Sequence, residues 1–448
     1  MNWQEDYKKK QISIEMAAKL IRSGDTVAMG HSVGAPSVDI YNAILDRYEE
    51  LQDVEILDVV QIRPCKLYDP EYMAKLQGHI TYIPPFGVAS IRKMYSSKLA
   101  DYFPVSTYDS GDKISQRADV AIVMVTPPNN QGYINLGLAD FYEMDTIRKG
   151  RASGKQRLTI AEVNDQMPVV YGNNWLHVSE FDYFIEHSSP LPVFGRSNPT
   201  EAEQTIAKHV LELIKDGDTI QMGIGGISEA VVAGLDGKHD LGIITEMLPL
   251  GLPQLIEKEV VTNSRKPFHK GVSIATFLMG DLALYDYARE NPALELYPAS
   301  YTNNPFFIAQ HPNMVTINMS LMVDLSGQIA SEGLGHKQIS GPGGQLDFMI
   351  GSFYSEGGRG IILINAARMA KDVLSSSIVP ELPPGMPVTV PRQFAQYVVS
   401  EYGIANLKYK TRRERALELI AIAHPDLRGE LRAALKKNFY PDFNIGKQ

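Results

Sequence analysis

Residues 213–226, LIKDGDTIQMGIGG, repeat the pattern of residues 20–34, LIRSGDTVAMGHSVG, 193 positions further along the chain. Each copy predicts the end of a helix, a tight turn at Gly-Asp, a short strand and then a glycine-containing loop. A unit that is used twice predicts two related α/β lobes. In open parallel sheets, ligands bind beyond the carboxyl ends of the strands, where both loops would lie. We therefore expect the two loops to face one another across a shared cleft.

The length of the chain and a segment rich in proline and glycine predict a domain boundary at residues 194–200. At 448 residues the chain is too long for one ordinary hydrophobic core, and its length suggests two domains or three. The segment FGRSNPT and two prolines just before it interrupt the pattern, and Thr200 then begins a helix with a capping box. We predict an N-terminal lobe over 1–193 and a C-terminal lobe over 200–448.

Composition argues against several classes of function. A net charge of -9 argues against a nucleic-acid-binding protein, although a local group of basic residues and loop amides can still hold an anionic ligand. The single Cys65 excludes an internal disulfide and a multi-cysteine metal site, and it predicts a core position in a reducing cytoplasm. The N-terminus lacks the apolar segment of a signal peptide, and no apolar run reaches the ~20 residues of a membrane span. We expect a cytoplasmic protein with no membrane or nucleic-acid partner.

Continuous apolar runs predict parallel strands that are buried on both faces. In the first lobe we expect a helix over 13–21, capped by Ser13, and strands over 26–29, 54–60, 120–125 and 158–163. In the second lobe we expect strands over 241–244, 315–317, 322–325 and 360–364, a hairpin turn over 357–360, and terminal helices over 412–423 and 427–437. Strands that alternate with helices in this way predict an α/β fold.

The loop GIGGIS, residues 223–228, is the first candidate ligand site. It follows a strand and precedes a helix, so its backbone N–H groups can approach phosphate or acyl oxygens. A tight turn without a ligand explains the same residues equally well. The loop lacks the third glycine of a dinucleotide-binding fingerprint, because Ser228 and Glu229 occupy that region.

The segment LGIITEM, residues 241–247, places a carboxylate beside this loop. If its apolar strand neighbours the strand that ends at Met222, then Glu246 and the glycine loop share one edge of the sheet. Apolar surroundings would weaken the hydration of this carboxylate, which would make it a competent covalent nucleophile. The alternative is a glutamate at a strand end that caps a helix or meets a lysine.

The segment SGPGGQLDF, residues 340–348, is the third feature. Its three glycines predict a loop whose N–H groups can stabilise an oxyanion, and Asp347 is expected to anchor the structure by accepting backbone donors. His31 either lines the cleft or satisfies its own loop, and we favour the second interpretation. Arg368 and Lys371, expected one helical turn apart, can meet an anionic ligand or remain solvated. The sequence contains no metal-binding motif and no serine-hydrolase motif.

Several segments, taken in order, make the chain resemble the acetyl-CoA hydrolase and 4-hydroxybutyrate CoA-transferase family of class I CoA-transferases. They are VTPPNNQGYINLG (125–137), EVNDQMP (162–168), GIGGIS (223–228), ITEM (244–247), SGPGGQLDF (340–348) and SEYGIANLK (400–408). The resemblance runs from about Ser13 to Phe439. Two positions depart from the family pattern: Ile244 replaces its His in the nucleophile motif, and Ser228 replaces a Pro of its glycine loop.

The resemblance implies two related open α/β lobes, the class I CoA-transferase fold, with the active site in the interdomain cleft. It implies that Glu246 is the nucleophile, which forms a glutamyl-CoA thioester, and that Gly343 and Gly344 form an oxyanion and CoA loop. The residues implied as CoA contacts are Gln221, Met222, Gly223, Ile224, Gly225, Gly226, Gly344 and Lys371. No metal and no permanently bound cofactor is implied, because coenzyme A is itself the substrate and part of the covalent intermediate. The family also implies a homodimer or homotetramer.

The leading functional hypothesis is a CoA-transferase that moves CoA from a short-chain acyl-CoA (butyryl-, 4-hydroxybutyryl- or propionyl-CoA) to acetate. The first alternative keeps the site but uses water, as an acyl-CoA hydrolase. We favour transfer because carboxylate exchange needs a glutamate nucleophile and simple hydrolysis does not. A nucleotide-dependent oxidoreductase is a further alternative, against which the missing third glycine counts. A non-catalytic CoA-binding protein is another, and Glu246 with both glycine loops argues against it.

Overall fold

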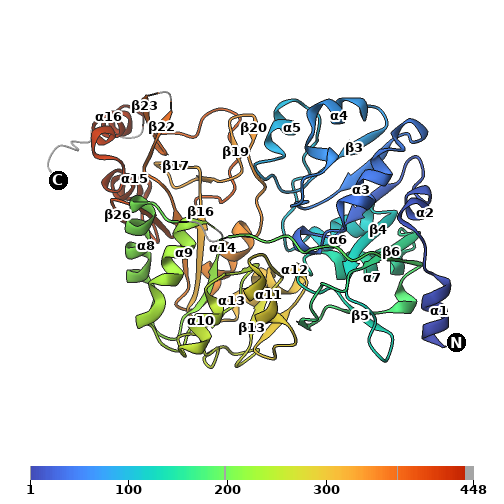
Figure 1. The fold of residues 1–448 in the computed structure, drawn as a ribbon. Helices are drawn as coiled ribbons and strands as arrows, with labels where there is room; N and C mark the ends of the chain where they lie inside the picture. Colours follow the sequence, from blue (N-terminus) through green and yellow to red (C-terminus); the bar gives the residue numbers. More distant parts are fainter. Residues whose placement is uncertain (1, 196–197, 224, 371, 439–448) are drawn as a thin grey trace.

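A computed structural model describes residues 2–195, 198–223, 225–370 and 372–438 of the chain, and in these residues it contains two six-stranded sheets (Figure 1). The first sheet is parallel throughout, in the order β3 (Ile80–Tyr82), β2 (Val54–Leu57), β1 (Thr26–Met29), β4 (Val120–Val125), β6 (Leu158–Val163) and β9 (Tyr183–Glu186). The second has the order β11 (Gly242–Ile243), β10 (Thr219–Met222), β16 (Met314–Met319), β21 (Arg359–Leu363), β25 (Tyr397–Ser400) and β26 (Gly403–Asn406). Only its last pair is antiparallel within this sheet.

Helices alternate with these strands along the chain. Those before residue 200 are α1 (Trp3–Lys9), α2 (Ile14–Lys19), α3 (Val38–Leu45), α4 (Pro70–Lys75), α5 (Arg92–Ser96), α6 (Ser110–Arg117) and α7 (Glu143–Ser153). Those after it are α8 (Glu201–Leu213), α9 (Gly226–Ala233), α10 (Leu252–Glu257), α11 (Leu282–Ala288), α12 (Ala299–Thr302), α13 (Pro305–Ala309), α14 (Gln345–Tyr354), α15 (Arg412–Ala421) and α16 (Arg428–Asn438). The predicted Ser13 cap and the predicted capping box at Thr200 are both present, since each hydroxyl accepts a backbone N–H of its own helix.

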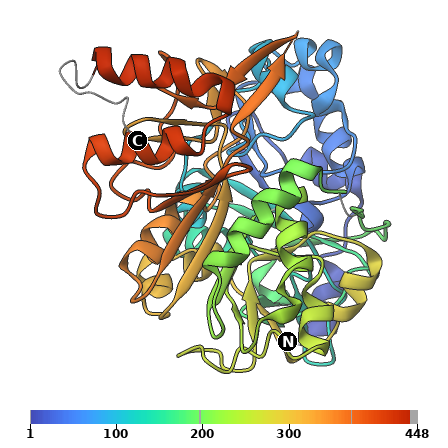
Figure 2. The ribbon, with the colours of Figure 1, turned by 90° about the vertical axis from the view of Figure 1, so that its left-hand side faces the viewer.

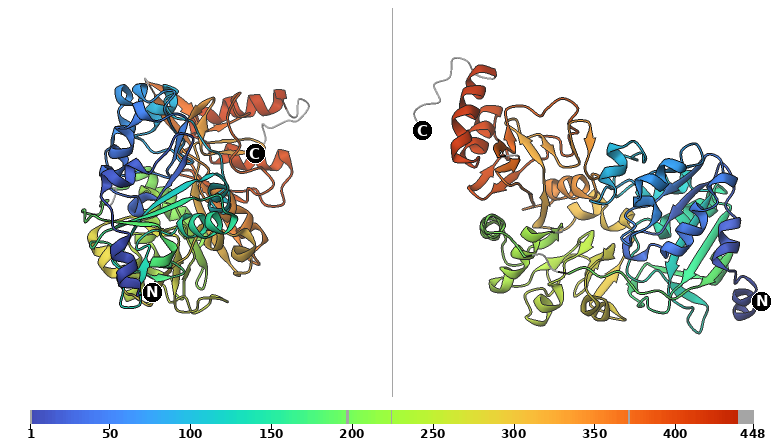
Figure 3. Two further views of the ribbon diagram at one scale, coloured as in Figure 1. Left: turned by 90° about the vertical axis from the view of Figure 1, so that its right-hand side faces the viewer. Right: turned by 45° about the horizontal axis from the view of Figure 1, so that its top comes forward.

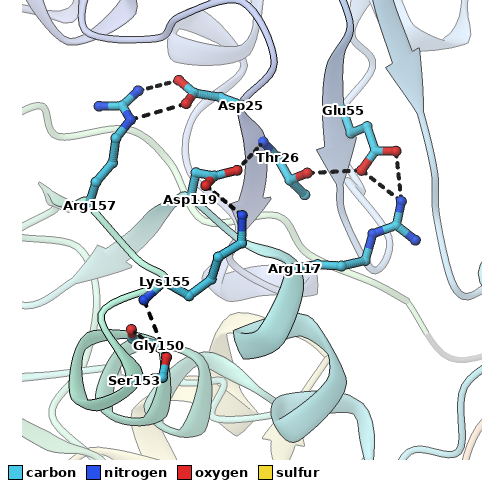
Figure 4. Close-up of polar contacts among 9 residues, drawn as sticks. All are labelled: Asp25, Thr26, Glu55, Arg117, Asp119, Gly150, Ser153, Lys155 and Arg157. Atoms are coloured by element: carbon cyan, nitrogen blue, oxygen red, sulfur yellow. Dashed lines mark hydrogen bonds and ion pairs between the residues drawn. The ribbon is translucent and has the colours of Figure 1, made fainter.

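The first copy of the repeated unit is held by an aspartate and an arginine. Asp25 pairs with the guanidinium of Arg157 (Figure 4). Asp25 also accepts the N–H of Arg22 at 2.7 Å, and Arg157 also donates to the carbonyl of Leu20 at 3.1 Å. Thr26 then begins β1. These contacts fix the turn between the helix end and the strand.

The second copy repeats the same contacts. Asp218 accepts the N–H of Lys215 at 2.6 Å and pairs with the guanidinium of Arg359, which donates to the carbonyl of Leu213 at 2.9 Å. The duplication seen in the sequence is therefore a duplication of tertiary contacts, which confirms the prediction of two related α/β lobes.

Strand register shows which residues of the two lobes correspond. Thr26 of β1 lies opposite Glu55 of β2, and the equivalent residue of β10 lies opposite Gly242 of β11. Four residues beyond each partner stand Val59 and Glu246. The end of β2 and the end of β11 are thus matched positions, one apolar and one acidic.

A seam of backbone hydrogen bonds joins the two halves of the chain, which lie side by side in Figure 3. Strand β7 (Tyr171–Gly172) pairs with β15 (Leu294–Leu296), which continues to β13 (Ser273–Ala275). Near the seam, β12 (Met247–Leu248) pairs with β14 (Phe277–Leu278), and Ala139 bridges to Phe277. The lobe boundaries at 193 and 200 stay a prediction.

The remaining short strands form small separate sheets. They are β5 (Tyr133–Asn135) with β8 (Trp175–His177), β17 (Met322–Asp324) with β18 (Ile329–Ala330) and β24 (Ile378–Val379), β19 (Gly333–Leu334) with β20 (Lys337–Gln338), and β22 (Ala367–Ala370) with β23 (Val373–Ser376). Helices α15 and α16 pack together at the end of the molecule farthest from the first sheet (Figure 2).

Two local expectations differ from the structure. The run 54–60 is a strand only to Leu57, and further along it Val60 adopts a left-handed φ of 68°. Residues 357–360 do not form a hairpin turn; the first two end the connection from α14, and the last two begin β21, which is parallel to its neighbours. A Cβ on Gly358 would lie 2.0 Å from the carbonyl oxygen of Ser352, so the glycine allows the helix end to approach the strand.

Candidate active site

Glu246 stands at the carboxyl end of β11, between that strand and β12. Its carbonyl oxygen accepts the N–H groups of Thr276 and Phe277 at 2.9 and 3.2 Å. The preceding Ile244 bridges to Ile274 and is fully buried. The backbone at Glu246 is therefore fixed on both sides, and its side chain extends beyond the sheet edge.

The carboxylate of Glu246 is held by three hydrogen-bond donors. The Asn303 amide donates to Oε2 at 2.8 Å, and the Gly344 N–H and the Thr107 hydroxyl also donate to the carboxylate. Burial raises the pKa of Glu246 to about 7, and these three donors oppose the rise because they stabilise the charged form. A carboxylate that is poorly hydrated yet fixed in place is suited to nucleophilic attack.

Asn303 and Thr107 were not identified from the sequence. Asn303 ends α12 and is fully buried, and its Oδ1 has no hydrogen-bond partner among the described residues. Thr107 comes from the first half of the chain. Neither residue lies in a glycine loop or a strand-end motif, so the sequence offered no signal for them.

The absence of a side chain at Gly344 leaves room for the carboxylate of Glu246. A Cβ there would lie 2.2 Å from Glu246 Oε2 and 2.2 Å from Asn303 Nδ2. Gly344 also caps the N-terminus of α14, so the positive end of a ten-residue helix faces the carboxylate. Its neighbour Gly343 has a φ of 53°, and a Cβ on it would lie 3.9 Å from Glu246 Oε1. The predicted loop thus lies directly against the predicted nucleophile.

Asp347 anchors a segment of the other lobe, as predicted from its place in the sequence. It accepts the Ser106 hydroxyl at 2.6 Å and the Tyr108 N–H at 3.0 Å, and so holds Thr107 between them. Burial raises the pKa of Asp347 to about 7, and the nearby charge of Glu246 adds to the rise. Asp347 therefore positions one of the three donors to Glu246.

The end of β10 and the loop after it also line the cavity. The side-chain amides of Gln221 and Asn318 pair through two hydrogen bonds of 3.0 and 3.3 Å. Gln221, Met222 and Gly223 line the same cavity as Glu246. Gly225 has a φ of 111° and precedes α9.

Two residues of the predicted CoA contacts, Ile224 and Lys371, lie outside the described residues. Gly226 is described, and it packs against α8, because a Cβ there would lie 2.8 Å from Glu203 Oε2. The expectation of a helix is wrong for Arg368, which belongs to β22 and pairs with β23.

The cavity beside Glu246 has a volume of about 510 Å³, within the range of small-molecule sites. The first lobe contributes His31, Val59 and Phe86. We expected His31 to satisfy its own loop, and this expectation is wrong, because His31 lines the cavity. The second lobe contributes the Gly341–Gly344 loop and Met247. Further lining residues are Val88, Ala89, Arg92, Met319 and Leu321. A second cavity of about 590 Å³ adjoins it and shares Gly223, Met247 and Met279.

Two features are absent from the described residues. These residues contain no group of three or more His, Cys, Asp or Glu side chains that could hold a metal ion. None of their helices is long and apolar enough to cross a membrane.

Two related parallel-sheet lobes that enclose a carboxylate beside a glycine loop define the class I CoA-transferase fold. The chain belongs to the acetyl-CoA hydrolase/transferase family, whose N-terminal domain model matches residues 1–194 and whose C-terminal domain model matches residues 280–435. It is an enzyme of the CoA-transferase class.

Relatives cover nearly the whole chain. It is 39% identical to the 4-hydroxybutyrate coenzyme A transferase of Clostridium kluyveri, over 98% of this chain and 100% of that protein. It is 38% identical to the succinyl-CoA:cyclohexane-1-carboxylate CoA transferase of Geobacter metallireducens, over 97% of each. The crystal structure of RipA from Yersinia pestis has a TM-score of 0.86 and 33% identity, over 98% of this chain and 99% of that one.

Proposed function

We propose that the chain transfers CoA from a short-chain acyl-CoA, such as butyryl-, 4-hydroxybutyryl- or propionyl-CoA, to acetate through a covalent thioester on Glu246. One observation carries the proposal: a carboxylate with a raised pKa faces a cavity beside the N–H of a glycine that admits no side chain. The CoA would lie along Gln221–Gly225 and Gly344.

The first half-reaction exchanges two leaving groups. Glu246 attacks the thioester carbonyl, the C–S bond breaks, and a mixed acyl-glutamyl anhydride and CoA thiolate form. The thiolate then attacks the glutamyl carbonyl, the anhydride C–O bond breaks, and the first carboxylate leaves. Glu246 is now a glutamyl-CoA thioester, so the free energy of the thioester is retained.

The second half-reaction reverses these steps with acetate. The acetate oxygen attacks the glutamyl carbonyl and releases CoA thiolate, which attacks the acetyl carbonyl and gives acetyl-CoA and free Glu246. Each tetrahedral intermediate carries an oxyanion, for which the N–H groups of Gly343 and Gly344 are the proposed donors. A well-placed donor of this kind contributes about 2.7–4 kcal/mol. Apolar walls that exclude water protect the anhydride from hydrolysis.

A direct test traps the intermediate. The enzyme is incubated with butyryl-CoA alone and treated with borohydride, and peptide mass spectrometry then searches for reduction at Glu246. We expect reduction at this residue and ping-pong kinetics with acetate. Turnover that persists while Glu246 remains unmodified would contradict the covalent route.

The acyl-CoA hydrolase is the second candidate, because the same site can admit water. Release of free CoA that does not depend on acetate would favour the hydrolase. Formation of one acetyl-CoA for each acyl-CoA consumed would favour transfer. We also propose a cytoplasmic location. We further propose that the protein is a homodimer or a homotetramer, and light scattering on the purified protein would distinguish these two assemblies.

A further inference from the structure

A loop outside the cavity, residues 263–272, is bonded to the strand that leads to Glu246. The side chain of Asn263 accepts the N–H of Ile243 at 2.9 Å, and the ammonium of Lys266 donates to the carbonyl of Ile243 at 3.1 Å. Ile243 lies three residues before Glu246. Asn263 and Lys266 are both buried, so the loop holds the end of this strand by its N–H and by its carbonyl.

The same loop is also bonded to α12, the helix that ends at Asn303. The Nε2 atom of His269 lies 2.7 Å from the hydroxyl of Tyr301, which is two residues before Asn303. The Nδ1 atom of His269 lies 3.3 Å from Oε2 of Glu295. Because an ionised carboxylate can only accept, Nδ1 carries the proton of the neutral ring, and Nε2 accepts the hydroxyl of Tyr301.

His269 is held in a backbone conformation that is uncommon for a residue with a side chain. Its φ is 51°, in the left-handed region, and its carbonyl accepts the N–H of Val272 at 3.1 Å. Neither His269 nor Tyr301 lines either of the two cavities described above. A strained residue that lies outside the cavity and bonds to a helix of the site indicates a role in positioning.

The titratable groups that face His269 come from its own loop, from residues 295–301 and from the turn after α13. They are Lys266, Glu295, Tyr297, Tyr301 and His311. Burial and the nearby Lys266 lower the pKa of His269, and Glu295 opposes this change. Burial also lowers the pKa of Lys266 to about 7. The ring of His269 is therefore uncharged near neutral pH, and it keeps Nε2 as an acceptor for α12.

We propose that His269 is a positioning residue, which holds α12 through the hydroxyl of Tyr301. Fixed in this way, α12 keeps the amide of Asn303 at 2.8 Å from Oε2 of Glu246. That hydrogen bond stabilises the ionised carboxylate, which is the form that the proposed reaction needs. The proposal rests on the proposed function, because the ionised form matters for the reaction only if Glu246 is the nucleophile.

Tyr301→Phe tests the proposal, because it removes one hydroxyl from α12 and keeps the aromatic ring. The variant should weaken the bond from Asn303, so the pKa of Glu246 should rise by about 0.5–1 pH unit. The acid limb of kcat/KM for butyryl-CoA should move upward by the same amount, so kcat/KM at pH 7 should fall roughly two- to fivefold. His269→Phe, which removes both ring nitrogens, should move the limb in the same direction.

The matched control is Tyr297→Phe. The hydroxyl of Tyr297 donates to Glu295 at 2.9 Å and its ring stacks on Tyr301, so the variant makes the same chemical change beside the same residues. Tyr297 lies before α12, and its hydroxyl bonds to β15, so the acid limb should stay within about 0.2 pH unit of wild type. Equal shifts in the two variants, or no shift in Tyr301→Phe, would overturn the proposal.

A double variant shows whether the effect passes through Asn303. Asn303→Ala should itself raise the pKa of Glu246, because it removes a donor to the carboxylate. Adding Tyr301→Phe to Asn303→Ala should then cause no further shift, because the two changes act through one hydrogen bond. A second shift of the same size as in the single variant would mean that α12 does not act through Asn303, and would overturn the proposal.

A measurement without substrate separates this proposal from the proposed function. Nuclear magnetic resonance of protein with an isotopic carbon label at the glutamate carboxyl groups follows the ionisation of Glu246, whose signal is absent from Glu246→Gln. A pKa that rises in Tyr301→Phe and not in Tyr297→Phe supports the positioning role even if no transfer to acetate occurs. Transfer through Glu246 with an unchanged pKa in Tyr301→Phe supports the reaction and refutes the role of His269.

Discussion

The two copies of the repeated unit end in loops that differ in what fills them. The first loop, residues 30–37, is buried along its whole length, and a Cβ on Gly30 would lie 2.4 Å from the carbonyl oxygen of Gly34. In the second loop Gly223 and Gly225 keep exposed surface, and a Cβ on Gly223 would have one neighbour within 4 Å, the carbonyl oxygen of Ile317 at 3.8 Å. The first loop is filled by protein, and the second leaves room for a ligand.

The same difference holds at the neighbouring strand ends. Val59 and Glu246 occupy matched register positions, and both line the cavity. The three donors that hold a carboxylate are gathered at the second strand end, around Gly344. The same arrangement of strands thus gives an apolar wall in one lobe and a candidate nucleophile in the other. The duplicated unit accounts for the shared backbone arrangement, and the residues that differ between the copies account for the difference in chemistry.

The largest expected effect comes from removing the acidic member of the matched pair. Glu246→Gln should lower kcat by at least about 10⁴-fold, because the amide cannot form the thioester. At the matched position, Val59→Ala should change kcat/KM by less than about tenfold. Initial rates measure the activity of both variants, and circular dichroism shows whether they are folded. Comparable losses of activity in the two variants would mean that both lobes contribute equally to the chemistry.

Gly344→Ala tests whether the glycine loop must touch the carboxylate. The added methyl would collide with Glu246 Oε2, so we expect a loss of about 10²- to 10³-fold in kcat. The control Gly335→Ala lies in the turn between β19 and β20, where the nearest atom would be 3.7 Å from the new Cβ. Because Gly335 has a φ of 61°, its variant should lose some stability but little activity. Full activity in Gly344→Ala would remove the loop from the mechanism.

The pH dependence should report the buried carboxylate of the second lobe. Because attack needs the ionised form, kcat/KM should fall about tenfold per pH unit below the pKa of about 7. A raised carboxyl pKa also means that the contribution of Glu246 to stability is complete below its ordinary pKa of 4.5 and is lost as pH rises through about 7. The melting temperature of Glu246→Gln relative to wild type should therefore increase between pH 5 and pH 8. Asp347→Asn should keep the kinetic inflection near 7, and an inflection that moves would assign it to the other carboxyl.

The smallest effects separate the two loops directly. Gly30→Ala should destabilise the fold by about 1–3 kcal/mol, because the first loop has no room for a methyl group. Gly223→Ala should leave the free energy of unfolding within about 1 kcal/mol and raise KM for acyl-CoA roughly tenfold, because the methyl projects into ligand space. Urea unfolding and steady-state kinetics on both variants measure the contrast. The same pattern in both variants would show that the loops are equivalent.

Local sequence predicted the parts of the fold that depend on burial along a strand. The limits expected for the strands 26–29, 120–125 and 158–163 match β1, β4 and β6, because a strand buried on both faces is apolar throughout. The place of Glu246 followed from the same logic, since a residue after a buried parallel strand must lie at the sheet edge. Its role as nucleophile is still a prediction.

Contacts between distant segments were not predictable in this way. Asn303 reaches Glu246 from 57 positions further along the chain, and its position depends on how α12 packs. Residues 367–370 contain Ala and Met, which favour helices, but pairing with residues 373–376 makes them strand β22. His31 was assigned to its own loop because its aromatic neighbours, Phe141 and Phe277, are far away in sequence.

The seam between the lobes has a genetic consequence. Asp347 accepts hydrogen bonds from Ser106 and Tyr108, and β15 pairs with β7. None of these contacts involves residues 187–200, which connect the two halves of the chain. A gene interrupted within that connection would encode two polypeptides, of which one carries Thr107 and the other Glu246. Each polypeptide alone would be inactive, and mixing them would restore activity in proportion to their association. The candidate active centre would then lie at an interface between two polypeptides, whereas here both sides belong to one chain.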